Sequence, residues 1–251
     1  MDSTQNFSGL AKDYTIGRPA YANALIEHLY SRYGFSDQSI IADIGLGTGK
    51  FAKQLLDKGS FVYGVEPNTD MRNIAIEELR NYEKFSAVSG NASETGLEEQ
   101  SVDFITTAQA FHWFDVLSFK KECKRILREN GKVFLIWNIR DMSHEVNQDS
   151  FKIFTKYCPN FKGFGGGIQK DDERIKQFFD EKYEYLEFDN PLTYNREKYI
   201  SRSLSGSYSL KKDDVNYFEY MKALSELYEK YQRDNVLMLK NKTVVYIGQL
   251  K

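Results

Sequence analysis

Residues 43–50 read DIGLGTGK and separate an apolar, strand-like run, SIIADIG at 39–45, from a helix-like stretch at 51–58. The order of strand, glycine-rich turn and helix is typical of a parallel α/β sheet. Such a turn brings backbone N–H groups and a helix N-terminus to the end of a strand. The stretch therefore predicts both the fold class and the place of a ligand.

The pattern continues outward from this turn, from about Ser39 to Asn138. Helices are expected near 48–58, 69–82 and 116–129, and Asn68 or Thr69 can cap the second. The short, polar run KFSAVSG at 84–90 predicts an edge strand. Four stronger runs predict inner strands: SIIADIG at 39–45, SFVYGVE at 60–66, SVDFITTAQ at 101–109 and GKVFLIWN at 131–138.

The alternation of strand-like and helix-like segments ends after Asn138, where aromatic and charged residues predominate. We expect a cofactor-binding core at 36–140, a cap formed by 1–35 and 141–235, and a final strand at about 243–250. The runs YEYLEFD at 183–189 and TVVYIGQL at 243–250 predict strands, and apolar residues at spacings of three and four predict a helix near 213–233. The glycines at 165–167 favour a flexible loop over a hinge.

Composition limits the classes of partner. The 251 residues have 34 basic and 36 acidic side chains, a formal net charge of -2, so no positive surplus is present for nucleic acid. No apolar run approaches the roughly 18 to 20 residues that span a bilayer. Cys123 and Cys158 have neither metal-ligand nor disulfide-framework spacing, and the first residues lack a signal pattern. We expect a cytoplasmic protein with a small-molecule partner.

Two phosphate-binding patterns fail at the glycine turn. A P-loop requires a glycine where Ile44 stands and a hydroxyl where Phe51 stands. The dinucleotide pattern G-x-G-x-x-G is met by Gly45 and Gly47, but Lys50 replaces its third glycine. The remaining pattern is Asp43 followed by the alternating Gly45, Gly47 and Gly49, which lets a ligand approach the backbone.

Glu66 strengthens the ligand hypothesis. It ends the second strand, 23 positions after Asp43, where a carboxylate can accept both hydroxyls of a ribose. Pro67 follows directly, so no adjacent basic residue is present for a 2′-phosphate. An adenosine-type ligand fits this combination.

These residues resemble the class I methyltransferases that use S-adenosylmethionine, in particular the small-molecule branch similar to the trans-aconitate enzymes. In that family the turn, here DIGLGTG, holds the methionine part of the cofactor, and the acid, here Glu66, holds the ribose. A family G-D-A loop at adenine is represented by Gly90, Asn91 and Ala92. The stretch AQAFHWFD at 108–115 resembles the family segment beneath the methionine and the transferred methyl group.

The resemblance extends over most of the chain. YTIGRPAY at 14–21 is similar to a segment that closes over the cofactor, and SRSLSGSYSL at 201–210 to a Ser-rich part of the cap. It implies an α/β, Rossmann-like doubly wound sheet of seven strands, order 3-2-1-4-5-7-6 with the last antiparallel, and an inserted cap. The expected cofactor contacts are Tyr14, Arg18, Asp43, Gly45, Gly47, Gly49, Glu66, Pro67, Met71, Asn91, Ala92, Ala108 and Gln109, and the expected acceptor contacts are Phe111, His112 and Trp113.

His112 is a candidate general base, but direct displacement of a methyl group requires a base only when the acceptor begins protonated. Its aromatic neighbours Phe111, Trp113 and Phe114 favour a neutral pocket wall. His28 and His144 have no metal-ligand partner at useful spacing, so no metal is expected.

The sequence therefore predicts a methyltransferase that uses S-adenosylmethionine and acts on a small molecule, with a carboxylic acid as one candidate acceptor. Two alternatives remain open. One is a noncatalytic sensor or assembly protein that binds the same cofactor, and the other is a nicotinamide-dependent oxidoreductase, which Lys50 disfavours.

Overall fold

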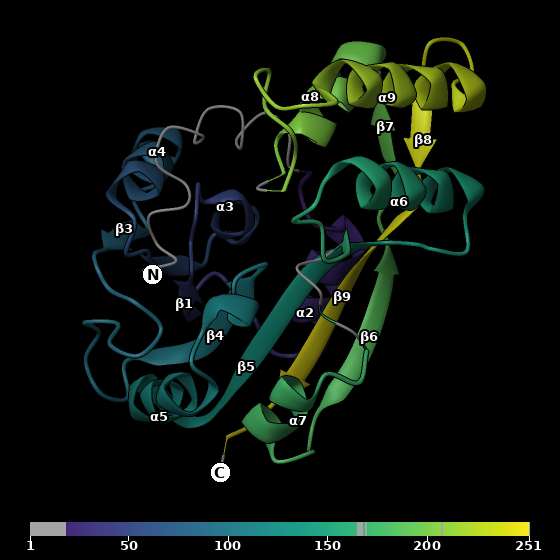
Figure 1. Cartoon of the computed structure of the whole chain (residues 1–251). Coiled ribbons are helices and arrows are strands. Elements are labelled where there is room, and N and C mark those ends of the chain that lie inside the picture. The colour runs from purple at the N-terminus through teal and green to yellow at the C-terminus, as the bar shows by residue number, and fades with distance from the viewer. Residues whose placement is uncertain (1–18, 165–167, 169, 207, 251) are drawn as a thin grey trace.

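The computed structural model describes residues 19–164, 168, 170–206 and 208–250 (Figure 1). Its main sheet has seven strands in the order β3-β2-β1-β4-β5-β9-β6. The first five strands are parallel, whereas β9 is antiparallel to both of its neighbours. The predicted order 3-2-1-4-5-7-6 and its antiparallel last strand are confirmed. The strands are β1 (Ile40–Ile44), β2 (Phe61–Val65), β3 (Phe85–Val88), β4 (Val102–Ala108), β5 (Leu127–Arg140), β6 (Glu184–Asp189) and β9 (Asn241–Gly248).

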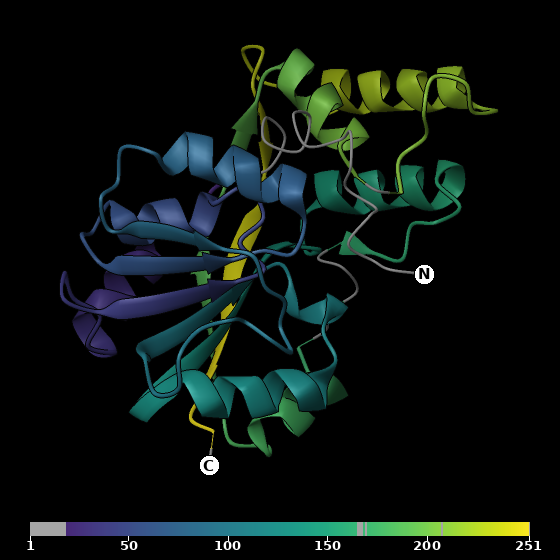
Figure 2. The same ribbon diagram turned by 90° about the vertical axis from the view of Figure 1, so that its left-hand side faces the viewer.

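Helices cover both faces of this sheet, as Figure 2 shows. On one face α2 (Asn23–Arg32), α3 (Lys50–Leu56) and α4 (Thr69–Leu79) pack against Ile41, Val62, Phe134 and Val245. On the other face α5 (Val116–Ile126) and α7 (Glu173–Phe179) pack against Ala42, Ile105, Val133 and Val244. Neighbouring residues of one strand thus serve opposite faces, which is why these strands read as nearly continuous apolar runs.

Two helix starts show how local sequence sets the ends of elements. The Asn68 side chain accepts a hydrogen bond from the N–H of Met71 at 3.0 Å, so Asn68 is the cap of α4. Asp115 does the same for Ser118 at the start of α5, at 2.8 Å. Each cap satisfies a backbone donor that the helix cannot. The cap at Asn68 lies just beyond the carboxyl end of β2, whereas the cap at Asp115 follows β4 after the short turn of helix at Phe111–Trp113.

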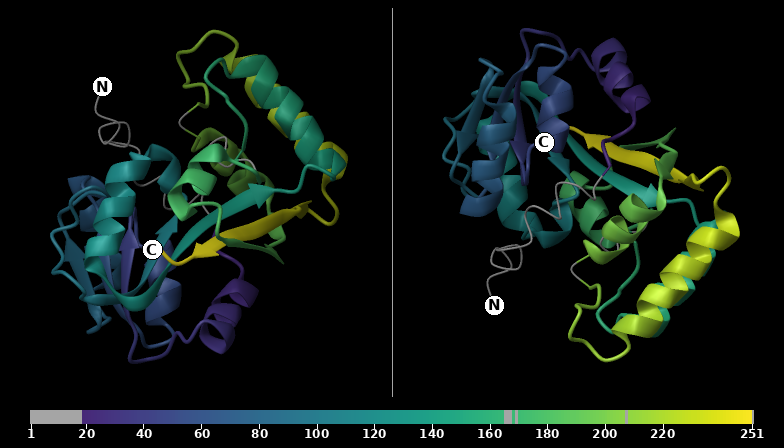
Figure 3. Two further views of the ribbon diagram at one scale, coloured as in Figure 1. Left: turned by 90° about the horizontal axis from the view of Figure 1, so that it is seen from below. Right: turned by 90° about the horizontal axis from the view of Figure 1, so that it is seen from above.

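A smaller layer stands beyond the ends of β5 and β9 (Figure 1). The helices α6 (Glu145–Tyr157) and α9 (Tyr217–Tyr231) are in contact; α9 lies above α6 in Figure 1, and the two overlap along one line in both views of Figure 3. With α8 (Arg196–Leu204) they share a core that includes Phe154, Tyr199, Tyr220 and Leu224. A two-stranded sheet of β7 (Leu192–Tyr194) and β8 (Leu237–Leu239) joins this layer to β6 and β9.

The predicted cap was too large. Helix α2, expected within the cap segment 1–35, packs on the main sheet through Leu25, Ile26 and Leu29. Helix α7 and strand β6, expected within 141–235, also belong to the main sheet and its helical cover. The physical reason is that each presents an apolar face to strands that are already buried. Among the described helices, none has both the length and the apolar character to cross a bilayer.

Candidate active site

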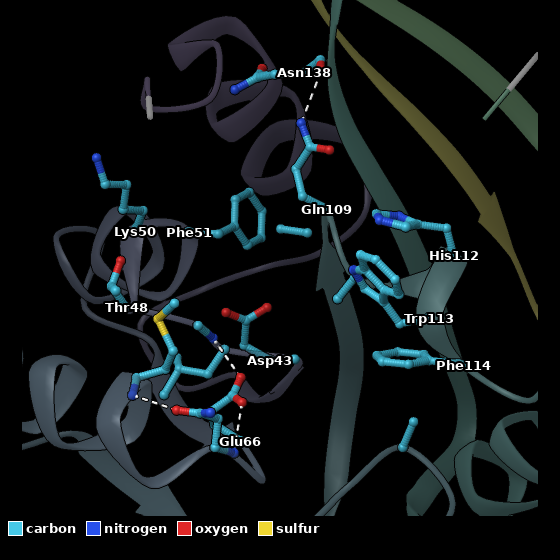
Figure 4. Close-up of a pocket in the computed structure, with 18 of the residues that line it drawn as sticks. Asp43, Thr48, Lys50, Phe51, Glu66, Gln109, His112, Trp113, Phe114 and Asn138 are labelled. Carbon is cyan, nitrogen blue, oxygen red and sulfur yellow. Dashed lines mark hydrogen bonds between the residues drawn. The ribbon is translucent and has the colours of Figure 1, made fainter. Parts of the chain in front are cut away.

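A cavity of about 670 Å³ opens at the carboxyl ends of β1, β2, β4 and β5, below the smaller layer. This end of a parallel sheet is where ligands bind in open α/β folds. Twelve of the predicted site residues line the cavity: Asp43, Gly45, Gly47, Glu66, Pro67, Met71, Asn91, Ala92, Ala108, Gln109, His112 and Trp113. Residues from four separate strand ends are thereby brought together (Figure 4).

The glycine turn forms the floor of the cavity. Gly47 has φ +58°, and a Cβ built on it would meet nothing within 4 Å, so its open side faces space that a ligand can fill. Gly49 also has a positive φ, but a Cβ there would stand 2.7 Å from Leu79 Cδ1. Gly49 therefore serves the packing of the turn against α4 and does not line the cavity, contrary to its predicted place among the cofactor contacts.

Glu66 is tied to this turn. Its Oε2 accepts the backbone N–H of Gly47 at 2.9 Å, and its Oε1 accepts that of Asn68 at 2.9 Å. The side chain is buried, and burial raises the pKa of Glu66 although both hydrogen bonds oppose that shift. A carboxylate has about four acceptor positions, so two remain for hydroxyl groups of a ligand.

Asp43 lies beside Glu66 at the end of β1 and is 1% exposed. Its Oδ1 accepts the Thr106 hydroxyl at 2.8 Å. Burial, with a smaller contribution from the Glu66 charge, raises the pKa of Asp43 to about 7, although the hydrogen bond from Thr106 opposes the shift. A buried acid of this kind gains from a positively charged ligand group nearby.

The loop after β3 brings Asn91 and Ala92 to the cavity. Asn91 Oδ1 accepts the backbone N–H groups of Ser93 at 2.8 Å and Glu94 at 3.0 Å, so this oxygen shapes the loop. The other end of the loop is held by Glu122, which accepts the N–H of Thr95 at 2.9 Å. The expected contact between Asn91 and adenine stays a prediction, and the two loop bonds leave the amide N–H₂ as the more accessible group.

The stretch at 108–115 divides between cavity and core. Gln109 has φ +61°, which is unusual for a residue with a side chain, and its Nε2 donates to the Asn138 carbonyl at 2.9 Å (Figure 4). Phe111 is 1% exposed and packs against Phe119 and Phe178 beneath α5, away from the cavity. The prediction that Phe111 contacts the acceptor is not supported, and Phe114 lines the cavity instead.

His112 and Trp113 both line the cavity, with ring centroids 4.9 Å apart. His112 Nδ1 accepts a long hydrogen bond of 3.5 Å from the Trp137 indole N–H. An Nδ1 that accepts leaves the proton of a neutral imidazole on Nε2, where it is a donor. This arrangement fits a neutral wall better than a base.

Several residues of the cavity, among them three basic side chains, were not predicted from the sequence. Arg140 at the end of β5, Lys162 after α6 and Arg202 on α8 line the cavity together with Phe164 and Tyr208. The acids Asp43 and Glu66 lie at the ends of β1 and β2, where Lys50 also lines the cavity. A signal for Arg140 was present, since it directly follows the apolar run of a parallel strand. Tyr14 and Arg18, predicted to close the site, lie outside the described residues, as do 165–167.

Comparison with known proteins agrees with this geometry. Residues 42–135 match the model of a methyltransferase domain. This matched segment is part of the Rossmann-like sheet. The matched residues run from β1 into β5 and include the glycine turn, Glu66, Asn91 and His112.

The individual relatives that the chain matches are also named as methyltransferases or methyltransferase-like proteins. An uncharacterized methyltransferase-like protein of Schizosaccharomyces pombe is 31% identical over 153 residues, which are 61% of this chain and 59% of that protein. The chain spans between 51% and 59% of the length of the first curated relatives that it matches.

Solved structures share the fold. A protein of Anaeromyxobacter dehalogenans named as a type II methyltransferase is 18% identical, with a TM-score of 0.62 over 93% of this chain and 98% of that one. Phosphoethanolamine N-methyltransferase 2 of Haemonchus contortus, solved with phosphomonomethylethanolamine and S-adenosylhomocysteine, is 16% identical, with a TM-score of 0.54 over 98% of this chain and 58% of that one. At these identities the likeness concerns the fold of the methyltransferase domain.

Proposed function

We propose that this chain transfers a methyl group from S-adenosylmethionine to a small-molecule acceptor by direct displacement. The observation that carries the proposal is the joint placement of Gly47, Glu66 and Asp43 at one end of the cavity. The Haemonchus enzyme of the same fold, which has S-adenosylhomocysteine bound, supports the choice of cofactor.

The residues present fit this cofactor. The open side of Gly47 gives room for a chain against the turn, and Glu66 retains acceptor positions for ribose hydroxyls. Asp43 offers a buried acid for a cationic group. S-adenosylmethionine, when bound, supplies a methyl group activated on a sulfonium, whereas the chain contributes binding, alignment and exclusion of water.

A small acceptor fits the dimensions. The cavity of about 670 Å³ has room beyond the turn, between His112, Trp113 and the residues of the smaller layer. This volume lies within the usual range of about 300 to 1,000 Å³ for small-molecule sites. We propose the cytoplasm as the place of action, supported by Cys123 and Cys158, which are buried free thiols.

The test is a transfer assay with S-adenosylmethionine labelled in its methyl group and a panel of small acceptors. We expect label in at least one acceptor, inhibition by S-adenosylhomocysteine, and loss of transfer in Glu66→Ala. Tight binding of S-adenosylhomocysteine without transfer to any acceptor would favour the noncatalytic sensor. Binding of NAD in its place would favour the oxidoreductase.

A further inference from the structure

We infer that Arg140 is a specificity-determining residue that binds an anionic group of the acceptor, set apart from the atom that receives the methyl group. This inference rests on the proposed function, because it assigns the acceptor class of the same cavity. It concerns a residue that lies outside the glycine turn and outside the ribose site.

The first observation is an unpaired cationic nitrogen. Arg140 lines the cavity, yet its Nη1 is buried and has no hydrogen-bond partner among the described residues. None of the salt bridges in the described part of the chain includes Arg140. Arg140 as a whole is partly exposed, but a guanidinium nitrogen buried without a partner is costly, so this nitrogen indicates that an anion can pair with the group.

The second observation is the way the guanidinium is held. Its central carbon lies 4.0 Å from the ring centroid of Phe164 and 5.7 Å from that of Phe154. These cation–π contacts, the nearer one to Phe164 above all, help to hold the guanidinium in place. The edge of the planar group is left for a ligand, and a carboxylate or phosphate can accept from this edge in a bidentate manner.

Neighbouring polar groups suit the same ligand. Asn241 pairs with Arg140 across β5 and β9, lines the cavity, and has a buried Oδ1 without a partner in the described part of the chain. A flip of the Asn241 amide group by about 180° would exchange its oxygen and nitrogen and present the N–H₂ to an anion. Arg202 also lines the cavity.

The position of Arg140 separates the anion from the methyl donor. Strand β5 lies two places from β1 in the sheet, which corresponds to about 10 Å at the usual spacing of about 4.8 Å between strands. The atom that accepts a methyl group must lie about 3 to 3.5 Å from the transferred carbon. The acceptor therefore carries an anionic group at a distance from its reacting atom.

The experiment measures anion binding directly, with malonate and inorganic phosphate as probes and with S-adenosylhomocysteine present or absent. We expect at least one probe to bind the wild-type protein, and Arg140→Gln to weaken that binding by roughly 10-fold or more, the scale of a lost charge-assisted hydrogen bond. Arg196→Gln is the matched control, because Arg196 lies on α8, outside the cavity, and should leave anion binding unchanged.

Arg140→Lys keeps the charge but loses the planar edge, and we expect binding between that of the wild type and that of Arg140→Gln. This variant decides the question if Arg140→Gln does not fold. Malonate without phosphate binding would identify a carboxylate acceptor, and the reverse a phosphate ester, both in support of the inference. Equal anion binding in wild type and variants, or none in the wild type, would overturn it, whereas failed S-adenosylhomocysteine binding would overturn the proposed function instead.

Discussion

Glu66 Oε2 accepts the backbone N–H of Gly47 at 2.9 Å, which joins the acid at the end of β2 to the glycine turn after β1. The carboxylate therefore has two tasks, because it shapes the turn and also faces the cavity. Under the proposed function, the part of the cavity near Glu66 and Asp43 is the cofactor half, and the part near Arg140 is the acceptor half.

Replacement of Glu66 should weaken binding of the cofactor. We expect Glu66→Ala to reduce the binding free energy of S-adenosylhomocysteine by about 1 to 3 kcal/mol, the scale of losing hydrogen bonds to a charged group. Calorimetry with the folded variant measures this. Asp70→Ala is the control, because Asp70 is an exposed acid in the first turn of α4 and does not line the cavity. Unchanged affinity in Glu66→Ala would rule out its assigned role.

Two glycines of the turn should respond differently to alanine. A Cβ on Gly45 would lie 2.4 Å from Ala110 Cβ, whereas a Cβ on Gly47 would meet nothing within 4 Å. Both have positive φ, which costs an alanine about 1 to 2 kcal/mol. Gly45→Ala should lose a further 1 to 3 kcal/mol, roughly, through overpacking. Urea unfolding compares the two, and equal losses of unfolding free energy would contradict the packing assigned to Gly45.

Binding of the cofactor should depend on pH through Asp43. Its pKa of about 7 means that the free protein holds a mostly neutral Asp43 below that pH and a charged one above it. A cationic ligand prefers the charged form, so affinity for S-adenosylmethionine should rise from pH 5 to 8 and be lost as the pH falls through about 7. Calorimetry across this range checks it. Asp43→Asn should bind more weakly and flatten the profile, and an unchanged slope in that variant would assign the dependence to another group.

The free energy of unfolding should change with pH in the direction opposite to that of cofactor affinity. Because the folded pKa of Asp43 lies above its ordinary value near 3.8, this residue lowers the free energy of unfolding progressively as the pH rises from about 4 to 7. Asp43→Asn should therefore gain most over the parent near and above pH 7. Urea unfolding at pH 5 and pH 8 measures the difference, and a larger relative gain at pH 5 would refute the buried, neutral acid.

His112 should act as a wall. Because its Nδ1 accepts from Trp137, we expect His112→Ala to raise the KM for the acceptor with little change in the pH dependence of kcat. S-adenosylhomocysteine binding should stay unchanged. The assay uses an acceptor found with the panel. Loss of a pH limb near 6.5 together with a roughly 100-fold fall in the single-turnover rate would instead make His112 a base.

Much of the core could be predicted from the sequence because its signals are local. The apolar runs of β1, β2, β4 and β5 are continuous in the sequence, side-chain caps mark the starts of α4 and α5, and the polar run at 84–90 became the edge strand β3. The turn and Glu66 could be found for the same reason, since each ends a strand. Their hydrogen bond, by contrast, depends on the pairing of β1 with β2 and has no sequence signature.

The acceptor half could not be predicted in this way. Arg140, Lys162 and Arg202 come from three separate segments, and only the packing of α6 and α8 beyond β5 brings them to one wall. Phe111 and Phe114 show the same limit on a smaller scale. Both are aromatic residues of one short stretch, and the single turn of helix at Phe111–Trp113 decides which of them enters the core.

The most direct test of the central claim is calorimetry of the purified protein with S-adenosylhomocysteine and with NAD under the same conditions. The account predicts binding of S-adenosylhomocysteine at one site per chain, abolished or strongly weakened in Glu66→Ala, and no measurable heat from NAD, because Lys50 stands at the third glycine position of the dinucleotide pattern. Binding of NAD without binding of S-adenosylhomocysteine would contradict it.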